Sequence, residues 1–224
     1  VPEVNEFIEK NFKSGGCLGF DGRCVSAKNA AIYFDIAQDK GGELATTEDL
    51  VDLIWEDRPA LPKATTWVLA DEYSGETMES KIARIRQEMK KKKADTHLLT
   101  SLYDIAYVLN IRGNDIESVP VFLSFLLITD DSVILFTNTE NWPEETLSYL
   151  NDKGVKLYPY DMVYHYMQSA DLADKAVLLD ESIVNYNLVK ALKGSAKIID
   201  GKNPSELMRA IKNETEIKNT KLIA

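Results

Sequence analysis

The tetrapeptide Asn-Ile-Arg-Gly at residues 110–113 is the most distinctive chemical feature of the chain, because it interrupts a strongly apolar stretch. The planar guanidinium group of Arg112 suits recognition of backbone carbonyls or of a peptide carboxylate. Gly113 permits a tight turn beside it. The alternative is a salt bridge from Arg112 to Asp115 or Glu117, a kind of near-neighbour pair that is frequent and weak.

The chain has few residues that ligate transition metals. A metal site needs several ligands that converge, and the sequence has only 2 His and 2 Cys. His97 heads an apolar segment and His165 lies between two tyrosines on an expected helix, so both are interpreted as structural. Cys17 and Cys24 match no zinc or redox motif, and a reduced cytoplasmic protein is the default expectation.

Motifs for nucleophilic or phosphate chemistry are absent from the sequence. It contains no Gly-x-Ser-x-Gly elbow. The glycine-containing stretches at residues 13–16 and 40–42 lack the Gly-Lys-Ser/Thr order of a P-loop and are typical of helix ends. We therefore assign no catalytic residue and no metal ligand within this chain.

Charge and hydropathy argue against two classes of partner. The formal net charge is −10, which disfavours binding to nucleic acid or to anionic membranes. The lysine run at 90–93 closes an expected helix, where cations meet the negative end of the dipole. No apolar run approaches the roughly 20 residues that cross a bilayer. The first ten residues lack the pattern of a signal peptide, so we expect a cytoplasmic location.

Residues 1–62 have the pattern of an incomplete α/β unit. We expect a helix near residues 4–12, a strand at 17–20, a second helix after an N-cap at Ser26, and a third helix after Thr47. One or two strands are too few for an independent sheet, so this segment is interpreted as the C-terminal part of a domain. Residues 63–77 have no sustained period and are expected to be a linker.

From residue 78 onward, helical and strand patterns alternate. An apolar hairpin at 121–129 and 133–136 provides an antiparallel pair, and the other segments alternate as in parallel sheets. The expected fold is a three-layer α/β domain with a mixed sheet over residues 78–211. Its expected helices lie at 78–89, 103–109, 143–154, 162–168, 184–192 and from 204, and its other strands at 97–100, 155–160, 176–179 and 198–200.

Four separate stretches, in order, resemble the long cytosolic type of Xaa-Pro aminopeptidase, also called aminopeptidase P. They are residues 18–26 (LGFDGRCVS), 52–59 (DLIWEDRP), 101–125 around the Asn-Ile-Arg-Gly tetrapeptide, and 212–217 (KNETEI). Together they extend over essentially the whole chain. One departure is that Val119 stands before Pro120, where the family often has Asn.

The resemblance implies a fold and a domain order. It implies a creatinase/prolidase N-terminal-domain fold for residues 78–211, preceded by the C-terminal part of a similar first domain at 1–62. Residues 212–224 would begin the link to a "pita-bread" catalytic domain. In that family the catalytic domain binds two divalent metals, usually manganese, and activates a hydroxide that attacks the bond before proline. The residues that bind these metals would lie outside this chain, so the chain should be inactive alone.

The resemblance also implies roles for two residues. The second domain would restrict the substrate cleft to short peptides with proline at the second position. Arg112 would face the substrate, and Asn110 would cap the turn or touch the substrate. The implied partner is the chain's own catalytic domain, and homo-oligomer formation is left open.

Two alternatives remain. One is a pseudoenzyme-type peptide- or protein-binding module of the same fold, and the other is a stand-alone binding protein. The metal ligands encoded downstream would separate the first alternative from an active peptidase.

Overall fold

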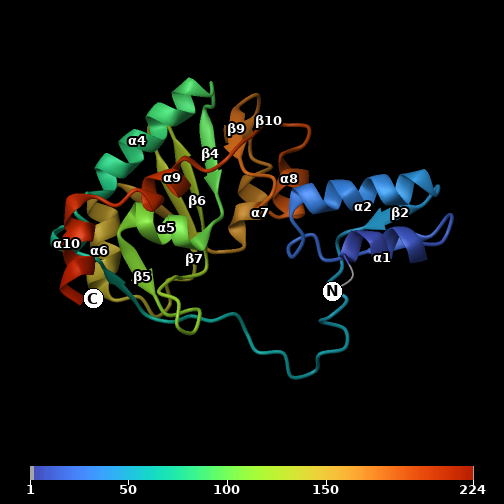
Figure 1. Cartoon of the computed structure of the whole chain (residues 1–224), viewed down its shortest axis with the longest axis horizontal. Helices are drawn as coiled ribbons and strands as arrows, with labels where there is room; N and C mark the ends of the chain where they lie inside the picture. Colours follow the sequence, from blue (N-terminus) through green and yellow to red (C-terminus); the bar gives the residue numbers. More distant parts are fainter. Residues whose placement is uncertain (1–2, 224) are drawn as a thin grey trace. The chain divides into compact units, whose positions relative to one another are not determined.

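The computed structural model describes residues 3–223, and these form two compact units. Among the described residues, the first unit contains those up to 60 together with 181–191, and the second contains 61–180 and those from 192 onward. In Figure 1 the first unit is mainly blue, and the second runs from green to red. The domain limits expected from the sequence stay a prediction.

The first unit contains α1 (Val4–Asn11), β1 (Cys17–Gly19), α2 (Ala27–Asp39) and β2 (Glu43–Ala45). The Ser26 hydroxyl accepts a hydrogen bond from the backbone N–H of Asn29 at 3.2 Å, which confirms the predicted N-cap of α2. Strands β1 and β2 pair in parallel. Residues 181–191, which include most of α8 (Tyr186–Leu192), also belong here: Ala27 N–H donates to the Val184 carbonyl at 2.9 Å.

The helix predicted after Thr47 is wrong, because this segment forms a series of turns. The Asp49 carboxylate accepts hydrogen bonds from the backbone N–H groups of residues 51 and 52 and also pairs with Arg58. Such local bonds compete with helix formation. The apolar residues that suggested a helix are not buried, since Leu53 is 75% and Ile54 is 81% exposed.

The second unit is built on a six-stranded sheet with the order β10-β9-β4-β6-β7-β8. Strand β6 runs antiparallel to β4 and β7, whereas the other neighbouring strands are parallel. This arrangement confirms the predicted mixed sheet. The strands are β4 (Thr96–Leu99), β6 (Ser124–Thr129), β7 (Val133–Thr137), β8 (Val155–Tyr158), β9 (Ala176–Leu179) and β10 (Lys197–Asp200).

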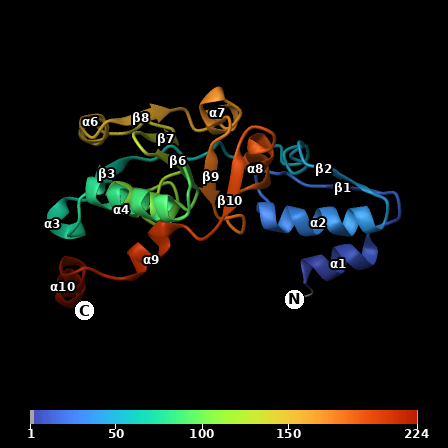
Figure 2. The same cartoon turned by 90° about the horizontal axis from the view of Figure 1, so that it is seen from above.

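Helices lie on both faces of this sheet, so the unit has three layers. Figure 2 shows α7 (Met162–Tyr166) on one side and α4 (Met78–Lys91) and α9 (Pro204–Ala210) on the other. The main apolar core lies between the sheet and the helices on the α4 side. These helices include α5 (Leu102–Leu109) and α6 (Glu144–Asp152). On the α7 side, aromatic rings pack together, such as Phe136 and Tyr166 with centroids 5.5 Å apart.

The segment expected to be a linker contains two short elements, β3 (Thr66–Val68) and α3 (Asp71–Ser74). Strand β3 pairs antiparallel with β5 (Ile111–Gly113) in a separate two-stranded sheet. Elements of three or four residues are too short to show a period, and this pairing joins distant parts of the sequence. A last helix, α10 (Glu214–Ile223), completes the unit.

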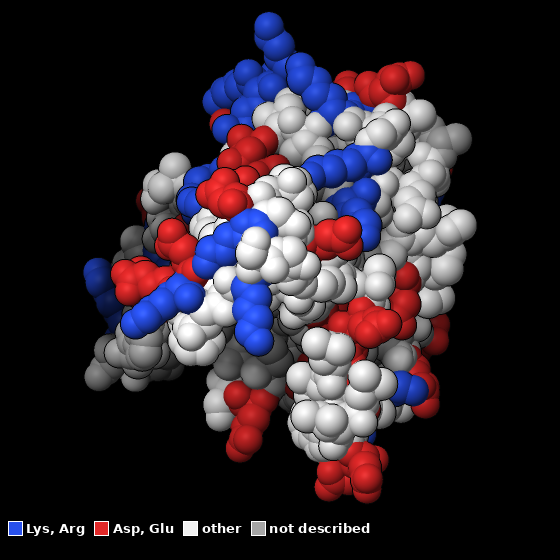
Figure 3. All heavy atoms as spheres, turned by 90° about the vertical axis from the view of Figure 1, so that its right-hand side faces the viewer, with Lys and Arg blue, Asp and Glu red and all other residues white. Residues whose placement is uncertain are grey.

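Acidic and basic side chains are interspersed on the face shown in Figure 3. The lysine run at 90–93 begins in the last turn of α4, so it closes a helix as predicted, and its side chains are exposed. Within residues 3–223, no helix is both long and apolar enough to cross a membrane.

His97 is fully buried in the central strand β4. Its Nδ1 lies 3.0 Å from the Leu178 carbonyl, to which the neutral ring donates. Its Nε2 has no hydrogen-bond partner among the described residues. Because burial disfavours the charged ring, the pKa of His97 falls to about 4.

We predict that acid destabilises the protein through His97. Its pKa is about 4 when folded and 6.5 when exposed, so between these values the unfolded chain binds more protons than the folded chain. The free energy of unfolding should therefore fall by about 3 kcal/mol as the pH drops from 6.5 to 4. Urea unfolding across this range tests this, and His97→Gln should show a shallower dependence. Equal slopes for the two proteins would contradict the prediction.

Candidate functional site

Asn110 ends α5 in the left-handed conformation, with φ +53°. Its N–H donates to the carbonyls of Ala106 and Tyr107 at the end of the helix. Asparagine tolerates this conformation better than most side chains do. The chain then enters strand β5, which contains Gly113. The sharp change of direction is therefore at Asn110 and does not extend to Gly113, although the sequence predicted a turn there.

The side chain of Asn110 is fully buried and fully bonded. Its Oδ1 accepts a hydrogen bond from Lys81 Nζ at 2.5 Å. Its Nδ2 donates to the Glu76 carbonyl at 2.9 Å, to Ser74 Oγ at 3.2 Å and to Asp71 Oδ1 at 3.3 Å. One amide thus joins α3, α4 and the start of β5.

Lys81 is a buried charged residue beside Asn110 that the sequence analysis does not single out. It is 1% exposed, donates to the Tyr107 carbonyl at 2.9 Å and lies 4.0 Å from the centroid of the Tyr107 ring. Burial lowers the pKa of Lys81 to about 8, although the Glu76 carboxylate opposes this shift. The available signal was its position on the apolar face of α4, at helical spacing from Met78 and Ile85.

Arg112 lies in β5 directly opposite Trp67 of β3. Its Nη1 donates to the Ala106 carbonyl at 2.7 Å and to the Ile111 carbonyl at 3.1 Å. The side chain is half-buried, and burial lowers its pKa, while the Glu216 carboxylate opposes the shift. The guanidinium group is therefore held in place by backbone oxygens.

The salt bridge considered for Arg112 does not form within residues 3–223, where Arg112 has no ion pair with either Asp115 or Glu117. The Asp115 carboxylate instead accepts from the backbone N–H groups of Ala64 at 2.8 Å and Leu123 at 2.7 Å. These two hydrogen bonds link the segment that precedes β3 in the sequence to the segment that precedes β6.

Gly113 is required for close packing rather than for a tight turn. It lies in extended strand β5, and a Cβ atom there would be 2.9 Å from Phe122 Cβ and 3.1 Å from the Val121 carbonyl. Ile111 and Gly113 are buried, while Arg112 and its partner Trp67 are more exposed. Directly opposed residues share one face of a sheet, so Arg112 and Trp67 lie on the outer face of this strand pair.

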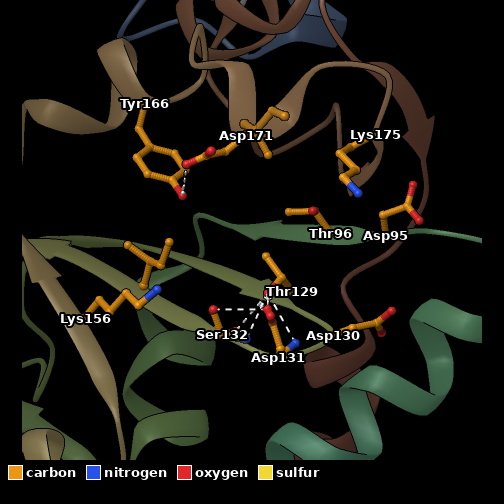
Figure 4. Close-up of a pocket in the computed structure, with 12 residues that line it drawn as sticks. Asp95, Thr96, Thr129, Asp130, Asp131, Ser132, Lys156, Tyr166, Asp171 and Lys175 are labelled. Atoms are coloured by element: carbon orange, nitrogen blue, oxygen red, sulfur yellow. Dashed lines mark hydrogen bonds between the residues drawn. The ribbon is translucent and has the colours of Figure 1, made fainter.

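In the described part of the chain, no group of three or more His, Cys, Asp or Glu side chains could hold a metal ion. A polar hollow of about 350 Å³ lies at the Thr129 end of β6 (Figure 4). The carboxylates of Asp131 and Asp171 are bonded to Thr129 and Tyr166 within its wall. Strand β5 lies near the opposite end of β6, so the hollow is separate from Arg112.

The comparisons with known proteins define the class. Residues 57–216 match the family described as "Creatinase/Prolidase N-terminal domain". The chain belongs to this family, and its α/β fold with a mixed sheet is the fold of that domain.

Its relatives are aminopeptidases. It is 34% identical to "Probable Xaa-Pro aminopeptidase P" of Sclerotinia sclerotiorum, over 97% of this chain and 38% of that protein. It is 31% identical to "Xaa-Pro aminopeptidase 1" of Dictyostelium discoideum, over 98% of this chain and 36% of that protein. The chain thus spans a little over a third of the length of these relatives, and the resemblance predicted from the sequence is confirmed.

A solved structure agrees over the same extent. The X-prolyl aminopeptidase of Caenorhabditis elegans matches with a TM-score of 0.86 and 25% identity, over 97% of this chain and 37% of that chain. It is described as a cytosolic enzyme with a di-nuclear active site.

We predict that Asn110 is essential for stability. Asn110→Gly should cost about 2 kcal/mol, because Lys81 and Ser74 lose a bonded partner. Asn110→Ala should cost about 1 kcal/mol more, because alanine is strained in the left-handed conformation. The measurement is denaturant unfolding of each variant.

Ser118 provides a matched control, since it is exposed and has φ +62°. Ser118→Ala should change the unfolding free energy by less than about 0.5 kcal/mol, because serine already has the Cβ atom that causes the strain at positive φ. Wild-type stability of Asn110→Gly would show that the buried amide contributes little.

Proposed function

We propose that this chain is the non-catalytic N-terminal region of a metal-dependent Xaa-Pro aminopeptidase. It restricts access to the substrate cleft and helps to shape it. The main support is the alignment with Xaa-Pro aminopeptidases along 97% of this chain but only 38% of the first relative. The parent protein is then a cytoplasmic hydrolase that removes an N-terminal residue preceding proline from short peptides.

In this proposal the metal chemistry belongs to a catalytic domain outside residues 1–224. Two divalent metals, with manganese as the expected ion, would activate water there. The proposed limits are 1–62 for part of a first creatinase-like domain, 63–77 for a linker, 78–211 for the second domain and 212–224 for the link to the catalytic domain. The alternative function is a pseudoenzyme-type module that binds peptides or proteins.

Arg112 is the proposed substrate-facing residue. In the described part of the chain its hydrogen bonds use Nη1, which leaves Nε and Nη2 for a peptide carbonyl or carboxylate. A guanidinium group already held by two carbonyls loses less conformational freedom on binding. Asn110 stays a predicted substrate-site residue, and because its side chain is fully bonded we propose that it contributes by holding β5.

We predict that only the full-length gene product hydrolyses a Xaa-Pro peptide. The assay compares that product with residues 1–224, each with and without Mn²⁺. Release of the N-terminal residue that precedes proline should require both the full-length protein and the metal. Cleavage by residues 1–224 would contradict the non-catalytic role, and an inactive full-length protein that still binds the peptide would support the pseudoenzyme.

We predict that Arg112→Ala in the full-length protein raises KM about tenfold with a smaller change in kcat, because one charged hydrogen bond is lost. Arg112→Lys should recover part of the affinity, since lysine keeps the charge but not the planar fork. Steady-state kinetics on one Xaa-Pro peptide measures both.

Arg86 offers a matched control, because it too is half-buried and donates to backbone carbonyls, at Thr129 and Ser132. These carbonyls lie beside the hollow, away from β5. Arg86→Ala should leave KM unchanged, and an equal effect of the two alanine variants would argue against a substrate contact by Arg112.

A further inference from the structure

Helix α10 is fastened to α3 by side-chain amides. Asn213 Nδ2 donates to the Ser74 carbonyl at 2.8 Å, and Asn219 Nδ2 donates to the Tyr73 carbonyl at 3.3 Å. Gly75 ends α3 in the left-handed conformation, with φ +69°. A Cβ atom on Gly75 would lie 2.4 Å from Asn213 Oδ1, so the start of α10 fits closely against a bare backbone.

Asn213 combines this contact with a second one at the start of α10. Its Oδ1 accepts from the Glu216 N–H at 2.9 Å, and its own N–H donates to Glu216 Oε2 at 3.0 Å. This reciprocal pair is a capping box, which fixes where the helix begins. The two amide atoms of Asn213 therefore have separate tasks: Oδ1 caps α10, and Nδ2 binds α3.

The α3 segment continues this connection to the candidate site. Ser74 is 3% exposed. Its carbonyl accepts a hydrogen bond from Asn213 Nδ2, and its hydroxyl oxygen accepts one from Asn110 Nδ2 at 3.2 Å. Asn110 is followed directly by β5, which carries Arg112. Direct bonds thus lead from α10 through Ser74 and Asn110 to the strand of Arg112.

We propose that Asn213 is a positioning residue, whose bond to Ser74 holds Asn110 and thereby sets the position of Arg112 in β5. This inference rests on the proposed substrate-facing role of Arg112. It gives α10 a task beyond stability, since a displacement of α10 would change substrate affinity. The acidic side chain of Glu216 supports the link, because its charge also acts on Arg112.

The test uses two variants of the full-length gene product. Asn213→Ser keeps a capping oxygen for α10 but removes the donor to Ser74. Gly75→Ala places a methyl group against Asn213. The matched control is Gly154→Ala, because Gly154 has the same φ of +69° but open space within 4 Å of a Cβ atom.

Hydrogen exchange measured by mass spectrometry should show about tenfold faster exchange in peptides that cover residues 111–113 for Asn213→Ser and Gly75→Ala, but not for Gly154→Ala. KM for a Xaa-Pro peptide should rise about threefold to tenfold, with kcat nearly unchanged.

Unchanged exchange at 111–113 in Asn213→Ser and Gly75→Ala would overturn the inference, whether or not α10 itself exchanges faster. Equal acceleration in Gly154→Ala would overturn it as well, because general destabilisation would then explain the effect. If exchange responds as expected but the unaltered protein does not hydrolyse Xaa-Pro peptides, the positioning link stands and the proposed function fails.

Discussion

The burial of the Lys81 ammonium group constrains the whole region around Arg112. A buried charge is costly unless each proton has a partner. Here two oxygen acceptors and the face of Tyr107 surround it. Asn110 supplies one of those acceptors, so the chain must turn sharply where α5 ends. The pairing of β5 with β3, and the placement of Arg112, follow from that turn.

The sequence predicted the elements whose own residues carry a strong pattern. Strands β6 and β7 are mainly apolar and are separated by Asp130, Asp131 and Ser132, and α2 has a serine cap, so each is visible locally. Strands β3 and β5 are three residues each and depend on each other across more than 40 positions. In the segment after Thr47 the sequence predicted a helix where the structure has turns. Apolar residues at helical spacing form a helix in a protein only when packing covers them.

The candidate site was only partly predictable for a related reason. Arg112 can be recognised in the sequence because an arginine beside a glycine is conspicuous within an apolar stretch. The sequence does not indicate that Lys81 is buried, because the surrounding helix has many charged residues and the hydrogen-bond partner Asn110 lies 29 positions away. The tight turn predicted at Gly113 is wrong, because this glycine lies in a strand and its close approach to Phe122 depends on tertiary packing.

The two-part composition of the first unit affects how it can form during synthesis. Its α2 helix is bonded to residues 181–191, and the whole of residues 61–180 must be made between these parts. Loop closure over such a span is slow compared with local folding. The first unit therefore cannot complete its fold during synthesis until residues 181–191, and with them most of the second unit, have been made. Its apolar residues therefore stay uncovered for longer than those of a unit built from one continuous segment.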